Sequence, residues 1–294
     1  MRLHQVTAGA VESTVLRCGD GDRLAVFLHG FPDGPWSFEA QMRAFAAEGF
    51  TAVAPWMRGY GSSRLTRGDG IAGNFYLSDV AHDVLMLIEA LGFESAVLIG
   101  HDWGAVTASV ASVLDRTRVD ALAMLAVPPM RTLLGNLRGN PDQVVRSLYM
   151  AAFQVPFIPE VALRAGRGAA LRWLWGRWSP GGSVPSAVRD RAIAELLEPG
   201  ALAQALSWYR HLLPVYRPWL EWEISWKLTL APLPPRGLVL AGARDGCMAP
   251  AVFEGAESAF EGPARLVTVD GAGHFMHLER PDDVNRLLLD FALG

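Results

Sequence analysis

The stretch Ala96-Val97-Leu98-Ile99-Gly100-His101-Asp102-Trp103-Gly104 decides the fold. Its first four residues predict a strand that is buried on both faces, and helical spacing of apolar residues begins at once over 103–114. Glycines stand two positions before and two positions after Asp102, so the turn from strand to helix can be very tight and the Asp102 side chain is pushed outward. The pattern therefore predicts that Asp102 occupies a reactive position at the end of a strand.

An aspartate at such a turn limits the chemistry. Its carboxylate is ionised at neutral pH without help from a base, and it can attack a saturated carbon to form an ester. It cannot act as an acylating serine, which argues against esterase or lipase chemistry. The alternative is that Asp102 merely caps the following helix. The flanking glycines, and the partner residues described below, favour the nucleophile.

Strand and helix patterns alternate on both sides of this turn. Alternation of this kind predicts right-handed βαβ units and therefore an α/β fold with a mostly parallel sheet flanked by helices. An antiparallel hairpin is predicted ahead of them, over 6–17. The other predicted strands are 24–28, 50–54, 121–127, 236–241 and 264–269. The predicted helices are 36–48, 75–91 and 282–291.

The alternation stops between residues 129 and 235. This segment shows helical patterns and breaks, but no run that is typical of a central strand. We therefore expect an inserted helical cap, or lid, between a first core part at 1–128 and a second at 236–294. Seven of the ten tryptophans lie between Trp173 and Trp226. They could fill the core of a small helical subdomain, or some could line an apolar substrate pocket beneath the lid.

Two loops that follow later strands supply partners for Asp102. Gly242-Ala-Arg-Asp245-Gly246 offers a carboxylate, and Gly271-Ala-Gly273-His274 offers an imidazole. The carboxyl ends of parallel strands meet at one edge of the sheet, where open α/β sheets build their sites. The chain order nucleophile, acid, histidine predicts that Asp245 orients His274, whose other ring nitrogen activates a water. The rival acid position, 128–130, reads Pro-Pro-Met and holds no carboxylate.

The remaining histidines have weaker claims to a catalytic role. His29 and His101 lie in the loops of the sequence motifs, where hydrogen bonds to the backbone are their expected role. His277, three residues after His274, is expected to be a packing or surface residue.

With these residues in place, the chain resembles the epoxide hydrolases of the α/β-hydrolase fold. His29-Gly30-Phe31-Pro32 is similar to the family's HGxP motif, and Gly100 to Gly104 to its elbow. The resemblance implies a cis proline peptide and an oxyanion hole formed by the backbone N–H groups of Phe31 and Trp103. Ala205-Leu-Ser-Trp-Tyr209-Arg210 resembles the lid segment that carries an acid tyrosine. Tyr209 could instead be an amphipathic core residue.

The chain departs from the family pattern in two places. Relatives usually carry an aspartate where Trp56 stands in Pro55-Trp-Met-Arg58-Gly-Tyr-Gly61, which implies a changed ion pair to Arg58. Many relatives carry a second lid tyrosine in a Tyr-Phe-Gln stretch, whereas this chain has Ala152-Phe-Gln. Tyr149 lies one helical turn earlier and could face the same side of a helix. Whether Tyr149 takes that role is left open by the sequence.

Composition excludes several classes of function. A net charge of −4 and a pI near 6.0 give no basis for a nucleic-acid footprint. Neither a secretory apolar segment at the N-terminus nor a run long enough to span a membrane is present. Cys18 and Cys247 lie far apart and form no metal-ligand cluster, and a reducing cytoplasm is expected. The chemistry predicted for Asp102 needs neither a metal nor an organic cofactor. Monomer and homodimer both remain open.

The sequence thus predicts that water is added to an apolar epoxide to give a vicinal diol, through an ester on Asp102. A lid phenol, of Tyr209 or with Tyr149, would protonate the epoxide oxygen. Two alternatives stay open. A haloalkane dehalogenase would share the aspartate ester, and the Trp103 indole could hold its halide. A non-catalytic ligand-binding protein could share the fold, although Asp102, Asp245 and His274 argue against it. The identity of the epoxide and the stereochemistry of its opening do not follow from the sequence.

Overall fold

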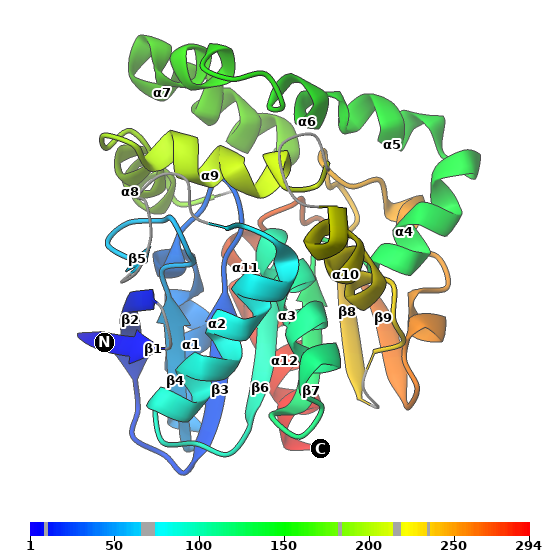
Figure 1. Cartoon of the computed structure of the whole chain (residues 1–294). Helices are drawn as coiled ribbons and strands as arrows, with labels where there is room; N and C mark the ends of the chain where they lie inside the picture. Colours follow the sequence, from blue (N-terminus) through cyan, green and yellow to red (C-terminus); the bar gives the residue numbers. More distant parts are fainter. Residues whose placement is uncertain (9–10, 66–73, 182–183, 214–218, 234–235) are drawn as a thin grey trace.

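The computed structural model describes residues 1–8, 11–65, 74–181, 184–213, 219–233 and 236–294 (Figure 1). Within this part of the chain, nine strands form one sheet in the order β1-β2-β4-β3-β6-β7-β8-β9, with the short β5 paired to β2. The strands are β1 (Arg2–Ala8), β2 (Val11–Cys18), β3 (Arg23–Leu28), β4 (Phe50–Pro55), β5 (Arg64–Leu65), β6 (Ala96–His101), β7 (Val119–Leu125), β8 (Gly237–Gly242) and β9 (Ala264–Val269).

The direction of the strands follows the sequence pattern. β1 and β2 pair antiparallel, which confirms the predicted hairpin, although its residues 9–10 lie outside the described residues. β2 also pairs antiparallel with β4, and from β4 to β9 every neighbouring pair is parallel. β4, β6 and β8 are buried along their whole length, as the nearly continuous apolar sequence of central parallel strands predicts. The predicted α/β fold is confirmed.

Helices cover both faces of the sheet (Figure 1). α2 (Leu77–Ala90) and α3 (Trp103–Leu114) pack against each other on one face, and α1 (Glu39–Ala47) and α12 (Pro281–Leu293) do so on the other. α3 has the predicted bounds. The predicted helix 36–48 is split into a 3₁₀ turn, Pro35–Phe38, and α1. A short helix, α11 (Met276–Glu279), lies between β9 and α12.

The predicted strand 121–127 is shifted in the structure. β7 begins at Val119 and ends at Leu125, because Ala126 adopts a φ of 62° and turns the chain away from the strand direction. A non-glycine residue rarely adopts such a backbone, and composition gives no hint of it. The turn brings the next residue, Val127, to the wall of the large cavity described below.

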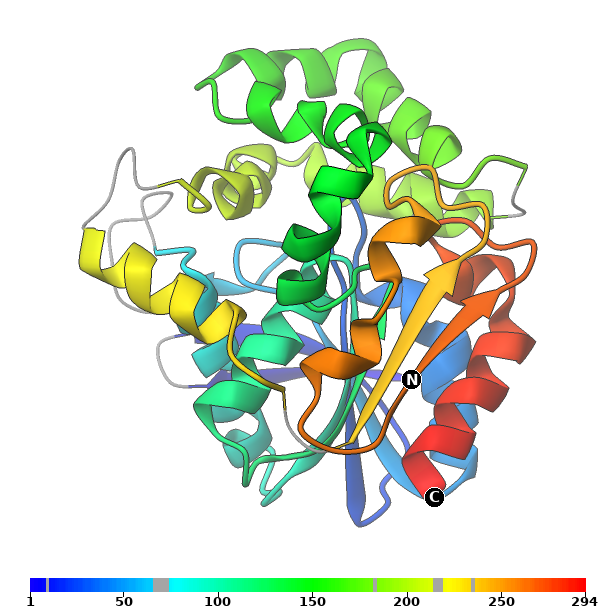
Figure 2. The same ribbon diagram turned by 90° about the vertical axis from the view of Figure 1, so that its right-hand side faces the viewer.

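Between β7 and β8 the described residues form helices and add no strand to the sheet. They are α4 (Met130–Asn136), α5 (Pro141–Arg146), α6 (Leu148–Ala152), α7 (Ile158–Trp178), α8 (Ser186–Leu196), α9 (Ala201–Arg210) and α10 (Trp219–Thr229). Residues 182–183, 214–218 and 234–235 of the expected insert lie outside the description. Figures 1 and 2 show α5 to α9 beyond the carboxyl ends of the strands. α10 instead packs against α2 and α3 of the core.

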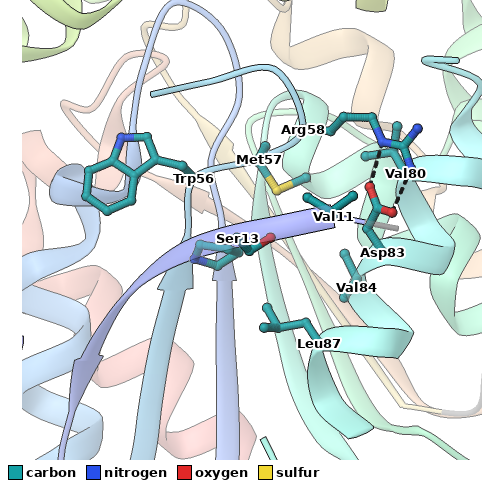
Figure 3. A pocket seen from close by; sticks show the side chains of 10 residues that line it. Val11, Ser13, Trp56, Met57, Arg58, Val80, Asp83, Val84 and Leu87 are labelled. Atoms are coloured by element: carbon teal, nitrogen blue, oxygen red, sulfur yellow. Dashed lines mark hydrogen bonds and ion pairs between the residues drawn. The ribbon is translucent and has the colours of Figure 1, made fainter. Parts of the chain in front are cut away.

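The segment from Pro55 to Gly61, in which the chain departs from the family pattern, makes an ion pair and a hydrogen bond to two helices. Arg58 makes a two-pronged ion pair with Asp83 of α2, with N–O distances of 2.7 and 2.6 Å. The Trp56 indole N–H donates to Glu195 Oε2 of α8 at 2.7 Å. Figure 3 shows Arg58 and Asp83 beside a small pocket of about 20 Å³, which has room for about one water. Arg58 thus keeps a carboxylate partner, and Trp56 connects the core to the helical insert.

Candidate active site

Asp102 stands at the turn between β6 and α3 with a φ of 53° and a ψ of −121°. The turn is tight enough to require glycine at both flanks. A Cβ at position 100 would come within 2.3 Å of the Gly104 carbonyl oxygen, and one at position 104 within 1.9 Å of the Leu28 carbonyl oxygen. The Asp102 side chain makes no capping hydrogen bond to α3. The geometry is therefore that of a buried carboxylate turned toward the cavity described below, and not of a helix cap.

The structure brings the three residues of the predicted triad together. His274 Nδ1 lies 2.9 Å from Asp245 Oδ2, and His274 Nε2 lies 3.6 Å from Asp102 Oδ2. Asp245 Oδ1 accepts hydrogen bonds from the backbone N–H groups of Cys247 and Met248 at 2.7 and 2.8 Å. Both carboxylate oxygens of Asp245 thus accept hydrogen bonds, which fix its orientation. Nε2 has no hydrogen-bond partner among the described residues, so it can bind a water beside Asp102.

The charges of Asp102, Asp245 and His274 shift one another's pKa values. Burial alone would lower the pKa of His274, but Asp245 and Asp102 outweigh it and raise that pKa to about 10. Burial works against ionisation of Asp102, and the His274 ring, with its N–H and positive charge 3.6 Å away, overcomes it, so the pKa of Asp102 lies below its usual value. At neutral pH the site therefore holds an ionised Asp102 carboxylate beside an imidazolium.

The predicted oxyanion hole lies against the nucleophile. The backbone N–H of Phe31 donates to Asp102 Oδ1 at 2.8 Å, and Phe31-Pro32 is a cis peptide, as the resemblance implied. Trp103 follows Asp102 as the first residue of α3, whose N-terminus favours negative charge. The Phe31 side chain is fully buried against Phe153 and Tyr209, so this residue offers the site its backbone N–H.

Both candidate lid tyrosines face the nucleophile from the helical insert. Tyr209 of α9 is buried, and its hydroxyl has no hydrogen-bond partner of ordinary geometry in the described chain, with the Trp103 indole as a close polar neighbour. Tyr149 of α6 packs edge-on against Tyr209 with ring centroids 5.9 Å apart, and its hydroxyl lies 3.8 Å from Cys247 Sγ. Burial, with the charge of Asp102 and neighbouring groups, raises both phenol pKa values well above 10.

A cavity of about 360 Å³ connects these groups. Its wall includes Asp102, Trp103, Tyr149 and Tyr209, and the rest is mostly apolar, supplied by α4, α5, α6 and neighbouring segments. The volume lies within the range of small-molecule sites, and a few polar groups in an apolar wall are typical of them. An apolar molecule in this cavity would lie between an ionised carboxylate and two un-ionised phenols.

The seven tryptophans between Trp173 and Trp226 take different places in the structure. Trp175, Trp178 and Trp208 are buried, and Trp226 is the one of the seven that lines this cavity. Trp103 of the core lines it as well. Packing in the core of the helical segment therefore holds for Trp175, Trp178 and Trp208, and lining of the cavity holds for Trp226. Trp173 and Trp219 are mostly exposed and do neither.

Two residues of the site were not found from the sequence. Cys247 lines the cavity, and its thiol is the polar neighbour of Tyr149. Asp33, one residue after the HGxP motif, lies buried with His101 and His277, and the three offer ligand atoms within 4.8 Å of one another. Burial raises the pKa of Asp33 to about 6 and, with the charge of His274, lowers that of His277 to about 3. Such a set could hold a cation, and ordered water could pair the same atoms.

His29 and His101 have the predicted backbone contacts. His29 Nε2 accepts from the Met57 N–H at 3.1 Å, and His101 Nε2 lies 3.0 Å from the His274 carbonyl oxygen. His277 is fully buried and stacks on Phe38 with centroids 4.7 Å apart.

Comparison with known proteins agrees with this geometry. A family model described as alpha/beta hydrolase fold matches residues 25–281. Epoxide hydrolase A of Mycobacterium tuberculosis is 30% identical, over 98% of this chain and 96% of its own length. The chain belongs to the epoxide hydrolase family of the α/β-hydrolase fold. Human epoxide hydrolase 4 is 27% identical, over 99% of this chain and 75% of its own length. The crystal structure of epoxide hydrolase A from Mycobacterium thermoresistibile, 30% identical, superposes with a TM-score of 0.80 and covers 100% of this chain and 98% of that one.

The candidate second phenol, Tyr149, does not lie at the position that the resemblance implied. Tyr149 lines the cavity from the start of α6, whereas Ala152 stands at the position at which the family pattern expects a tyrosine. In the described residues no helix is long and apolar enough to cross a membrane.

Proposed function

We propose that this chain adds water to apolar epoxides and releases vicinal diols, by way of a covalent ester on Asp102. The observation that carries the proposal is the placement of an ionised aspartate opposite two buried phenols across one apolar cavity. In this proposal the helices of the 129–235 segment that cover the nucleophile act as a lid. The substrate is a small-molecule epoxide.

In the first half-reaction, Asp102 attacks the less hindered epoxide carbon from the side opposite the C–O bond that breaks. Tyr209, with Tyr149 beside it, donates to the epoxide oxygen and transfers a proton as the alkoxide develops. A phenol with a pKa above 10 is protonated at neutral pH, and positioned acids of this kind accelerate reactions by roughly 10²–10⁴. The product of this step is a hydroxyalkyl ester on Asp102.

The ester changes the electrostatics of His274. Alkylation removes the negative charge of Asp102, which is one of the causes that raise the pKa of His274. The imidazolium can then give up its proton, which restores the phenol. Neutral His274, still oriented by Asp245, takes a proton from water as that water attacks the ester carbonyl. The oxyanion is stabilised by the backbone N–H groups of Phe31 and Trp103. Its collapse breaks the ester C–O bond, and the departing alkoxide takes the proton of the new carboxyl group, which releases the diol and leaves Asp102 ionised.

A panel of epoxides and haloalkanes, assayed for both diol and halide, tests the proposal. We expect diol from apolar epoxides and no halide from haloalkanes. Halide release without diol would support a dehalogenase instead, and binding without either product would support a non-catalytic protein.

A further inference from the structure

The outer helices of the lid expose an unusual number of large apolar side chains. Residues 130–178, which form α4 to α7, hold nine of the seventeen large apolar residues that are exposed in the described chain. The most exposed of them lie at the start of α7, where Phe157 is 79% and Val161 70% exposed, and Val145 of α5 is 65% exposed. Figures 1 and 2 both show α5 to α7 on the side of the lid that faces away from the sheet, whereas α4 packs against the 3₁₀ turn Pro250–Phe253 of the core. Contiguous exposed apolar groups of this kind mark interaction surfaces.

The same helices are strongly basic, although the whole chain is acidic. Residues 130–178 contain seven arginines and two acidic residues, a formal charge of +5, whereas the chain as a whole carries −4, which leaves −9 on the rest. Five of these arginines are exposed and make no ion pair with any described residue: Arg131, Arg138, Arg164, Arg167 and Arg177. Arg131, Leu134 and Arg138 share one face of α4 and the turn that follows it, by their spacing of three and four residues.

The exposed apolar surface is continuous with the substrate cavity. Leu134, Val144 and Leu148 line the cavity and are also exposed to the outside. The cavity therefore opens between α4 and α6, beside Arg131 and Arg138. An apolar path runs from the surface of the lid to Asp102.

We propose that the face formed by α4 to α7 docks on an anionic lipid surface, so that apolar epoxides enter the cavity directly from the bilayer. The use of the cavity rests on the proposed function, but the docking itself does not. Apolar side chains inserted at the headgroup level, surrounded by arginines, are the chemistry of helices that lie in a membrane interface. The acidic remainder of the molecule would be repelled by the same surface, which orients the cavity mouth toward the lipid.

Charge argues against a second copy of the chain as the occupant of this face. A symmetric dimer through α4 to α7 would place one set of seven arginines against the other, and like charges in an interface destabilise it. An anionic lipid surface matches the same arginines with opposite charge. Docking of this kind weakens as salt screens the interaction.

Flotation of the full-length protein with vesicles measures the docking without any need for turnover. We expect binding to vesicles of phosphatidylcholine with phosphatidylglycerol, much weaker binding to phosphatidylcholine alone, and loss of binding at high salt. Diol formation from a small, water-soluble epoxide is measured in parallel. Diol without vesicle binding would overturn the docking alone, and vesicle binding without diol would overturn the proposed function alone.

Variants on the lid face and matched variants on the core sharpen the test. Arg131→Gln with Arg138→Gln should weaken binding about fivefold per arginine, the effect of one basic residue near an anionic surface. Val145→Asp with Phe157→Asp should abolish it. Arg265→Gln and Leu293→Asp, at exposed positions of the core, should leave binding unchanged. None of these side chains lines the cavity.

Two results would contradict the inference. Equal loss of binding in the lid and core variants would show that net charge, and not this face, drives the association. A dimer in light scattering that Val145→Asp dissolves, with no vesicle binding by the unaltered protein, would assign the face to a second copy of the chain.

Discussion

The polar groups on the two sides of the cavity differ in how many hydrogen bonds they make. On the core side, Asp245 accepts three hydrogen bonds, and Asp102 accepts one from the Phe31 N–H. On the lid side, the Tyr209 hydroxyl is buried without a hydrogen-bond partner of ordinary geometry in the described chain, and Tyr149 has only a thiol at 3.8 Å. On the core side, the carboxylates are already hydrogen-bonded before a substrate binds. On the lid side, the phenol hydroxyls remain available to donate a hydrogen bond to a substrate.

This difference separates two tasks. Fixed dipoles and charges around Asp102 and His274 stabilise negative charge without reorganisation during the reaction. An unpaired buried hydroxyl costs free energy, and that cost is relieved when an acceptor oxygen enters the cavity. The lid phenols therefore favour a ligand that brings an oxygen, as an epoxide does and a haloalkane does not.

The largest effect is expected on the core side. His274→Gln should slow ester hydrolysis by roughly 10³–10⁴, because water loses its base, while Asp102 still forms the ester. Rapid mixing should show about one equivalent of substrate consumed and an enzyme mass raised by that of the substrate. A folded variant that shows no such burst would contradict the assignment of His274 to the second half-reaction.

Asp245→Asn tests the same side through the orientation of His274. It should trap the ester less completely than His274→Gln, because the imidazole is present but has lost the carboxylate that holds its tautomer. Ester hydrolysis measured in single turnover reports the difference. A larger defect than that of His274→Gln would point to another role for Asp245.

A smaller effect is expected on the lid side. Tyr209→Phe should slow alkylation of Asp102 by roughly 10², and Tyr149→Phe by about tenfold, because the remaining phenol still donates. The rate to measure is pre-steady-state alkylation, since slow ester hydrolysis would hide the effect in steady state. Tyr60→Phe is the matched control, because its buried hydroxyl also lacks a hydrogen-bond partner among the described residues, and Tyr60 does not line the cavity. Alkylation by Tyr209→Phe within about twofold of the unaltered rate would remove Tyr209 from the mechanism.

The core side could be predicted from the sequence, whereas the lid side could only be predicted in part. The turn at Asp102 and the loops of Asp245 and His274 follow strands, and the edge of a parallel sheet brings such loops together. The contact of Tyr149 with Tyr209 depends on how α6 docks beside α9, and helical periodicity does not fix the docking of one short helix on another. Cys247 and Asp33 carry no motif of their own, although each lies next to one.

The smallest expected effect is a difference in pH dependence between the two half-reactions, alkylation of Asp102 and hydrolysis of the ester. The pKa of Asp102 lies below its usual value and those of the phenols lie well above 10, so alkylation should be constant between about pH 5 and 9. Ester hydrolysis needs neutral His274 and should rise with pH through a pKa lower than the value of about 10 in the free enzyme. Both rates come from stopped-flow single turnovers. Alkylation that rises or falls tenfold across this range would contradict the charge states assigned to the site.

The ester on Asp102 is the central claim, and a single turnover in heavy-oxygen water tests it most directly. Water attacks the ester carbonyl in this mechanism, so the new oxygen should appear first in the Asp102 carboxylate and not in the diol. Digestion and mass spectrometry of the Asp102 peptide, with mass measurement of the diol, locate the label after one turnover. Label in the Asp102 side chain with an unlabelled first diol is the predicted result. Label in the diol of that first turnover, with an unlabelled Asp102, would mean that water attacks the epoxide directly and that no ester forms.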